Sequence, residues 1–427
     1  MSAVAPIALR REAAPATFPA AAPLYLVLLS LPVWWVLGLA YFIWPLLTLP
    51  LLFSLLARGE IRRPPFFGVW VLFLAWMMLS GVELHGRGGM LAFAWRGVMY
   101  LSATSLFLYV FNAPRERYSN RTIVMVMALF WVEIVAAGLV GVLLPNGSFT
   151  TPFASVLPAS LANDENIRFM IYPKFAEVQT FLGYPVGRPR VLFPYSNQWG
   201  ACIGILTPLA VAAVLQMRKS LKRRLFIGLL LLSLVPIVVS LNRGLWLALV
   251  AAVAYLGIRF VRLRNLKVLG AALAALAVAA AIVVATPLNG VLQDRLTTHS
   301  NSTNTRLSVY GKTTEQVKKS PLLGYGSPKA SHDPNAPPAG TQGQLFLVGY
   351  SHGIPGLIFF VGWFLIGLLY SRRFNTREQP WAHVAFLILL LEIPYYSLMP
   401  TTLHAMMVIA ALAWRNVVDP PPVPEAS

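Results

Sequence analysis

The sequence predicts an all-α, polytopic membrane protein with about twelve transmembrane helices. Hydrophobic residues make up 57% of the 427 residues, charged residues only 11%, and the mean hydropathy is +0.66. Apolar stretches of roughly 17 to 25 residues recur along the whole chain, and each is long enough to cross the hydrocarbon core of a bilayer. A soluble domain of this size could not bury so many uninterrupted apolar runs.

The apolar runs define the order of the predicted helices. We place them at 24–40, 41–57, 65–82, 89–112, 122–144, 193–217, 225–240, 244–260, 268–287, 345–371, 380–398 and 402–415. The first two are expected to break near Gly38 and Pro45. Residues 24–415 thus form one transmembrane domain between a tail at 1–23 and a Pro-rich tail at 416–427, whose composition predicts disorder.

The net charge of +19 comes from short Lys/Arg clusters that alternate with the apolar runs, not from one basic patch. This pattern follows the positive-inside rule and argues against a nucleic acid as partner. It places both termini in the cytoplasm and the two long loops, 145–192 and 288–344, on the outer face, with short amphipathic helices in those loops. The Ala-rich N-terminal stretch precedes the first apolar run, whereas a signal-peptidase site would follow it, so we expect that helix to be retained.

Few residues suit metal or redox chemistry. Cys202 is the single cysteine, so no intrachain disulfide can form. The chain has no clustered Asp pair, no HExxH motif and no P-loop. We therefore expect no metal and no cofactor.

Two short motifs place arginines where the chain re-enters the membrane on the predicted outer face. Arg243 lies in the tight turn LNRG, and Arg188 and Arg190 lie in VGRPRVLFPYSNQWG, whose prolines oppose a regular helix. One interpretation is that these arginines anchor helix ends at the interface. The other is that their guanidinium groups bind the diphosphate of a membrane-embedded lipid, with Gly244 letting the ligand approach the backbone.

The second long loop is expected to contain an amphipathic helix over 306–319. Leu307, Tyr310 and Val317 share one side of it, and Pro321 stops it. A Gly-rich turn, GYGSP, follows.

Four motifs in this order carry a family resemblance: RVLFPYSNQWG, the Arg-Gly turn, SPLLGYG and TQGQLFLVGYSHGIPG. The chain resembles the O-antigen ligase and polymerase family of bacterial membrane glycosyltransferases over roughly residues 185–370. The resemblance implies an enzyme of the bacterial plasma (inner) membrane that moves a glycan from a polyprenyl-diphosphate carrier to a glycan or lipid acceptor on the outer face. It also implies that Arg190, Arg243 and Arg306 bind the diphosphate or support its site. Ligase and polymerase activities both remain open.

The chain departs from this family at the acceptor side of the site. The family carries a His-Asn pair where the helix after the second long loop begins, and the matching position here is Gln342, followed by Gly343. Glutamine can orient a hydroxyl group but cannot remove its proton. His332, in the Pro-rich part of the loop, and His352, about two turns into the helix, are the other candidates for a catalytic base.

Two carboxylates lie within predicted helices, where ionisable groups are costly and often functional. Glu133 and Glu392 could each pair with an arginine from a neighbouring helix or accept a proton. The alternative function is a transporter or flippase for a lipid-linked or anionic substrate, which predicts pseudo-symmetric halves and discontinuous helices. The two unequal outer loops favour the transferase.

Overall fold

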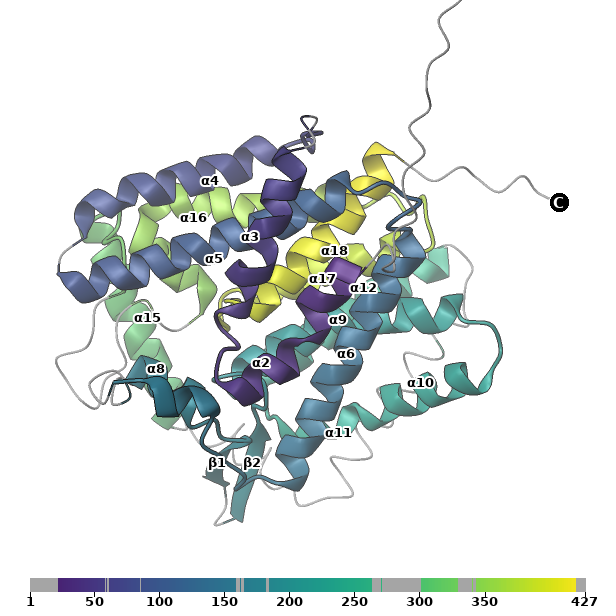
Figure 1. Ribbon diagram of the computed structural model, residues 1–427, viewed down its shortest axis with the longest axis horizontal. Coiled ribbons are helices and arrows are strands. Elements are labelled where there is room, and N and C mark those ends of the chain that lie inside the picture. Colours follow the sequence, from purple (N-terminus) through teal and green to yellow (C-terminus); the bar gives the residue numbers. More distant parts are fainter. Residues whose placement is uncertain are drawn as a thin grey trace, which may run out of the picture.

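The computed structural model describes residues 22–57, 59, 61–84, 86–158, 162, 165–181, 184–262, 270, 301–328, 340 and 343–419. These residues form a helical bundle with one small β-hairpin at its edge (Figure 1).

Helix α18 (Thr401–Val418) is the centre of the bundle. Every side chain from Thr401 to Asn416 is buried, and the segment is rich in Ala, Leu and Met, which favour helix. Its neighbours are α5 (Arg87–Asn112), α6 (Asn120–Leu143), α9 (Ser196–Gln216), α16 (Gln344–Tyr370) and α17 (Gln379–Glu392). Figure 1 shows α4 (Phe67–Leu79), α5 and α16 side by side at the upper left, and α4 continues into the short 3-10 helix η1 (Ser80–Glu83).

Five helices of the described chain are long and apolar enough to cross a membrane: Gly88–Asn112, Asn120–Leu143, Ser196–Gln216, Gln344–Tyr370 and Thr401–Val418. Shorter apolar helices lie at Ile43–Leu56, Phe67–Glu83 and Gln379–Glu392. The prediction of a mostly helical, polytopic membrane protein is therefore confirmed. The number of twelve spans stays a prediction, and the expected helix at 268–287 lies almost wholly outside the described residues.

Several predicted spans are divided into shorter helices. The first two become α1 (Ala22–Leu29), α2 (Leu31–Leu37) and α3 (Ile43–Leu56), with the break at Gly38, whose φ is 86°. Pro45 instead lies in the first turn of α3, where a missing N–H costs little. The span predicted at 225–240 is divided into α10 (Leu221–Leu232) and α11 (Leu234–Val239). Pro236 accounts for that break, because it cannot donate to the carbonyl four residues earlier and its ring clashes with it.

The first long loop is not purely helical, so the all-α prediction is wrong there. It contains η2 (Pro152–Val156) and α8 (Glu165–Ile171), then an antiparallel pair, β1 (Ala176–Phe181) and β2 (Tyr184–Pro189). Ala176 pairs with Pro189 and Phe181 with Tyr184, so only two residues join the strands. Pro185 and Pro189 oppose a helix, whereas a two-residue connection is the commonest way to join antiparallel strands.

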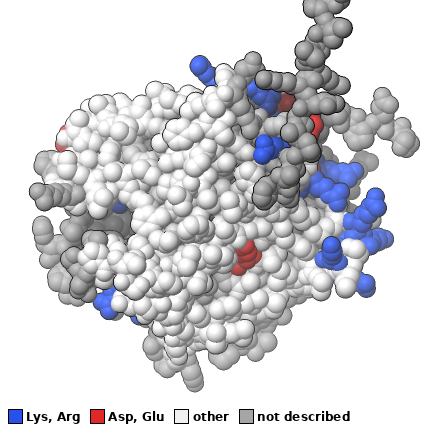
Figure 2. Space-filling view, viewed as in Figure 1, with Lys and Arg blue, Asp and Glu red and all other residues white. Residues whose placement is uncertain are grey.

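The short basic connections meet at one end of the bundle, which we call the arginine-rich end. Hydrogen bonds join them in series: Arg62 with Asn112, Arg115 with Asn120, Asn120 with Asn416, and Asn416 with Thr376. In Figure 2 most of the visible Lys and Arg side chains lie toward the upper right, and the broad white face carries one acidic patch, over α6.

The β-hairpin lies at the opposite end, which we call the hairpin end. Helix α6 connects the two, since it begins beside Asn416 and its far part packs against β2. Its 24 residues span about 36 Å, more than a hydrocarbon core. Basic connections at one end and loop structure at the other agree with the topology expected from charge, while the side of the membrane that each end faces stays a prediction.

Cysteine labelling can assign the two ends to sides of the membrane. Ser155, exposed in the first long loop, and Lys219, exposed between α9 and α10, would each be replaced by cysteine in a Cys202→Ala background, since Cys202 is fully buried. We expect Ser155→Cys to react with a membrane-impermeant thiol reagent in intact cells, and Lys219→Cys only after permeabilisation. The opposite pattern would overturn the predicted topology.

Candidate functional site at the hairpin end

Arg188 on β2 holds the hairpin against the helical bundle. Its Nε donates to the Ser240 carbonyl at 2.7 Å, and its Nη2 donates to Asn242 Oδ1 at 2.6 Å and to Asn197 Oδ1 at 2.9 Å. Its Nη1 lies 3.4 Å from Glu177 Oε2. Because Arg188 is only 5% exposed, this guanidinium serves mainly to join β2, the start of α9 and the turn before α12 (Arg243–Arg262).

Asn242 extends the same network from the other side. Its side-chain amide donates to the Ser196 carbonyl at 3.0 Å, and its backbone N–H donates to Ser240 Oγ at 3.3 Å. The motif RPRVLFPYSNQWG and the turn SLNRG are therefore bound to each other. Arg190 lies two residues after Arg188, and Arg243 directly follows Asn242.

Arg190 is half-buried, and its Nε is buried with no hydrogen-bond partner in the described part of the chain. Burial lowers the pKa of the Arg190 guanidinium, while the nearby Glu177, Tyr195 and Tyr41 raise it. Arginine starts from so high a pKa that the group stays charged near neutral pH. Arg190 therefore presents a positive charge with an unused donor.

Arg243 is the first residue of α12 and is exposed. The expectation that a ligand approaches the backbone at Gly244 is wrong, because Tyr396 fills that space. A Cβ atom at Gly244 would lie 2.7 Å from the Tyr396 hydroxyl oxygen, which accepts a hydrogen bond from the Leu245 N–H at 3.1 Å.

Two leucines close to Arg190 and Arg243 have a strained backbone conformation. Leu192 has a φ of 72° and Leu241 a φ of 52°, and both are buried. Such values are rare outside glycine, asparagine and aspartate, and they persist only where surrounding contacts enforce them. Strain of this kind concentrates at functional sites, and here it lies two residues from Arg190 and two from Arg243.

Tyr396 links the turn before α12 to the start of α16. Its hydroxyl group contacts the first turn of α12, and its carbonyl accepts a hydrogen bond from the Gln344 N–H at 2.9 Å. Gln344 is two residues past Gln342, which itself lies outside the described residues, as does His332. The chain on either side of Gln342 is fixed by contacts: the Gly340 N–H donates to Thr313 Oγ1 at 3.2 Å, and Gly343 packs against Pro394.

The predicted amphipathic helix of the second loop is α15 (Asn301–Lys319), and it ends before Pro321 as expected. Tyr310 stacks on Phe346 of α16, with ring centroids 4.2 Å apart and planes within 9°. Val317 faces Gly349 of α16. Arg306 lies in α15, but its side chain and that of Leu307 lie outside the described set.

The GYGSP turn docks onto a break in α16. Gly353 has a φ of 68° and a ψ of −173°, and Ile354 donates to the Pro321 carbonyl instead of to Tyr350. Pro355 has no N–H to donate to Ser351. The two carbonyls left over accept hydrogen bonds from the turn, Tyr350 from the Tyr325 N–H at 3.0 Å and Ser351 from the Gly326 N–H at 2.8 Å.

His352, beside this break, is fully buried. Its Nδ1 lies 2.7 Å from Ser80 Oγ, and the Ser80 hydroxyl donates to the Met77 carbonyl at 2.6 Å. Its Nε2 has no partner among the atoms that the structure describes. Phe73 and Phe93 surround the ring, so His352 lies in an apolar interior.

Sequence reasoning missed the polar residues that connect the motifs. Asn242 was not singled out, nor was Arg96 of α5, whose Nη1 lies 3.3 Å from Ser327 Oγ in the GYGSP turn. The signal for Asn242 was its place beside Arg243. Arg96 is a charge inside a predicted span, which by itself marks a residue for attention.

The two intramembrane carboxylates have no arginine partner within the described residues. Glu392 is fully buried, packs against Gly204 of α9, and has no hydrogen bond to either carboxyl oxygen. Glu133 has one buried oxygen without a partner. Of the two expectations, pairing with an arginine is therefore not observed among the described residues.

Replacing Gly324 tests the docking of the turn. Gly324 has a φ of 68°, and a Cβ atom there would lie 2.4 Å from the Tyr350 carbonyl oxygen. Gly324→Ala should cost at least about 1–2 kcal/mol for the left-handed backbone, with the steric clash in addition. We expect a clearly lower thermal unfolding temperature and faster proteolysis of the second loop.

Gly311→Ala is the matched control, because this position in α15 has open space and a helical backbone. It should be neutral or stabilise by up to about 1 kcal/mol. Equal stability of the two variants would contradict the docking of the turn.

Comparison with known families agrees with the motifs. Residues 228–361 match the family model described as O-antigen ligase. The matched segment contains the SLNRG turn, α15, the GYGSP turn and the break in α16, and the RPRVLFPYSNQWG motif precedes it. No curated protein matches the chain. Over residues 228–361 the chain is therefore similar to the O-antigen ligase family, which agrees with the resemblance seen in its motifs.

Proposed function

We propose that the protein is a membrane glycosyltransferase that moves a sugar or glycan from a polyprenyl-diphosphate carrier to an acceptor on the outer face of the plasma membrane. The match to the O-antigen ligase family model supports glycan transfer in a membrane. The observation that carries the finer proposal is the convergence of three motifs: Arg188 and Asn242 join the segments of Arg190 and Arg243, and Tyr396 joins Arg243 to the segment of Gln342.

In this proposal Arg190 and Arg243 bind the diphosphate. A guanidinium group donates two parallel hydrogen bonds to phosphate and keeps its charge at all relevant pH values. The unused Nε of Arg190 and the exposed side chain of Arg243 suit this role. Arg306 adds charge from α15. Arg188, whose donors are taken up by four protein groups, positions the other two.

The reaction is a displacement at the anomeric carbon. The acceptor oxygen forms the new bond from the face opposite the diphosphate, the bond from carbon to the diphosphate oxygen breaks, and the electron pair leaves with the diphosphate. The configuration is inverted. Arginines that are already in place stabilise the charge that develops on the leaving group, without a metal ion.

The proton of the acceptor needs little basicity if the bond to the diphosphate breaks early. Gln342 then orients the acceptor hydroxyl group, and the proton passes to solvent or to the leaving diphosphate. His352, inside an apolar pocket beside the break in α16, acts as a positioning residue. His332 is a further candidate base.

Divided helices favour the alternative, a transporter or flippase, because transporters use discontinuous helices at their substrate sites, and the clearest of them is the break in α16. Here the freed backbone groups bind the GYGSP turn. Purified protein supplied with a lipid-diphosphate-linked glycan and no ion gradient should form the transferred product. A protein that moves the lipid across vesicles but forms no product would be a transporter.

Lysine replacements test the diphosphate site. Arg190→Lys and Arg243→Lys should each lower turnover by about 100-fold or more, because an ammonium group cannot reproduce the two parallel hydrogen bonds. Thermal stability should hardly change. Arg168→Lys, an exposed position in the same loop, is the matched control and should keep its activity. Near-normal turnover in Arg243→Lys would return that residue to an interfacial anchor.

Two alanine variants test the role of a base. Gln342→Ala should lower turnover by about tenfold through the loss of an orienting contact. His352→Ala should lower the unfolding temperature, since it leaves a void beside Ser80, while turnover of the folded protein falls less than tenfold. A fall of about a thousand-fold, the effect of removing a general base, would instead identify His352 as the base.

A further inference from the structure

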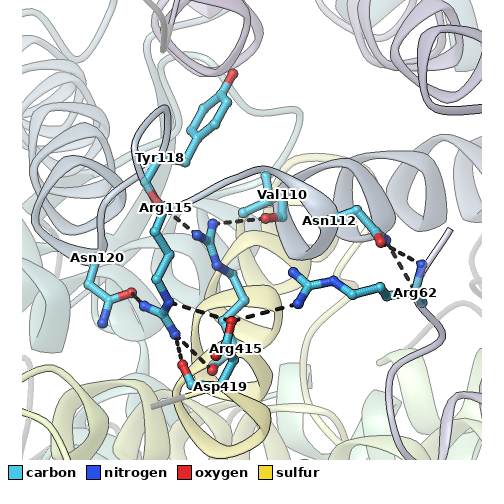
Figure 3. Close-up of polar contacts among 8 residues, drawn as sticks. All are labelled: Arg62, Val110, Asn112, Arg115, Tyr118, Asn120, Arg415 and Asp419. Atoms are coloured by element: carbon cyan, nitrogen blue, oxygen red, sulfur yellow. Dashed lines mark hydrogen bonds and ion pairs between the residues drawn. The ribbon is translucent and has the colours of Figure 1, made fainter. Parts of the chain in front are cut away.

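A cavity at the arginine-rich end lies far from the site described above. Its volume is about 240 Å³, and Arg62, Arg115, Arg415 and Asp419 line it. These residues come from the connection before α4, the connection after α5 and the last turn of α18. Figure 3 shows the guanidinium groups of Arg62 and Arg115 beside Asp419, and that of Arg415 directed to the carbonyls of Val110 and Tyr118.

Two of the arginines are held in place by backbone carbonyls. Arg415 is 3% exposed and donates to the carbonyls of Val110 and Tyr118 at 3.0 and 2.9 Å. Arg115 donates to Asn120 Oδ1 and to the Arg415 carbonyl, both at 3.0 Å, and to the Asp419 carbonyl. Their charges therefore have fixed positions.

Arg62 is fixed at its backbone but not at its guanidinium group. Asn112 accepts from the Arg62 N–H at 2.7 Å and donates to its carbonyl at 3.2 Å. The guanidinium carbon lies 5.7 Å from the centre of the Phe111 ring, and the side chain is 55% exposed. The N–H groups of the Arg62 guanidinium therefore face the cavity, where few protein groups accept their hydrogen bonds.

Asp419 is a weak partner for so much charge. Its carboxylate is 57% exposed and lies 3.6 Å from Arg62 and 3.9 Å from Arg115, beyond hydrogen-bond distance. Glu116, the other acidic residue of the cavity, is exposed. Because three arginines and only two carboxylates line the cavity, its net charge is positive.

We propose that this cavity binds a phosphate group, and that Asp419 occupies the place of that anion when it is absent. Helices α5 and α18 end at the cavity and α6 begins beside it, as expected for arginines at the depth of the lipid headgroups. Guanidinium groups bind phosphate through parallel hydrogen bonds that a single carboxylate at 3.6 Å does not supply. An anionic phospholipid headgroup and free phosphate share this chemistry.

Thermal unfolding of the purified full-length protein in detergent distinguishes these ligands. Phosphatidylglycerol, phosphatidylcholine and inorganic phosphate would be titrated separately. We expect phosphatidylglycerol to raise Tm and phosphatidylcholine to have no such effect. A rise with inorganic phosphate alone would support the site with free phosphate as its ligand. No rise with either anion would overturn the proposal.

Variants show whether the anion binds in this cavity. Arg62→Gln should weaken anion binding on the order of tenfold, whereas Arg63→Gln, the adjacent exposed arginine that does not line the cavity, should not. Asp419→Asn should strengthen binding several-fold, because it removes the competing carboxylate. Equal losses in Arg62→Gln and Arg63→Gln, or weaker binding in Asp419→Asn, would show diffuse surface attraction and refute the proposal. Because stability is measured, the outcome is independent of transferase activity.

Discussion

A helix that breaks inside a bilayer leaves N–H and C=O groups that hydrocarbon cannot satisfy. Because unpaired backbone groups are costly, the break in α16 determines where the GYGSP turn of the second long loop docks. At Gly353 the bonds to the Tyr350 and Ser351 carbonyls are lost, the second because Pro355 has no N–H. The GYGSP turn supplies both missing donors, and the Pro321 carbonyl accepts from Ile354. Loop and helix therefore stabilise each other, and α15 is held against α16. A break that would suit a transporter serves in this chain to fix a loop.

The arginines of one short motif differ in role because their surroundings differ. A guanidinium group inside a bundle is tolerated only when protein groups accept its donors, since an unpaired buried charge is strongly destabilising. Arg188 meets that condition with four acceptors, and Arg415 meets it with two carbonyls. Arg190 does not, because its Nε lacks an acceptor. The unpaired Nε donor makes Arg190 suited to an anionic ligand, whereas Arg188 and Arg415 stabilise the fold.

Much of the fold follows from the length and order of the apolar runs, and the least predictable parts are those that depend on contacts distant in sequence. The end of α15 before Pro321 and the break at Gly38 are local effects of proline and glycine, so the sequence predicts them. The β-hairpin depends on pairing between Ala176 and Pro189, which an all-helical pattern conceals. The difference between Arg188 and Arg190 depends on Asn242, more than fifty residues away. The candidate site was therefore predictable as a set of motifs, but not as a division of roles among arginines.

Tyr396 connects the motifs of the candidate site to the last two helices, α17 and α18. It lies between these helices and outside the motifs themselves. It lies after α17, and its hydroxyl and carbonyl groups bind the starts of α12 and α16. The central helix α18 follows directly, and its burial leaves little freedom for the turn that carries Tyr396. An anionic lipid bound as proposed would meet backbone segments that are already ordered, so binding would not have to order them first. The strain at Leu192 is held by packing in the main core, whereas Leu241 packs in a separate cluster with Val186 and Trp246. The packing of α18 thus limits the turn of Tyr396, and Tyr396 binds the backbone beside Arg243 and Gln342.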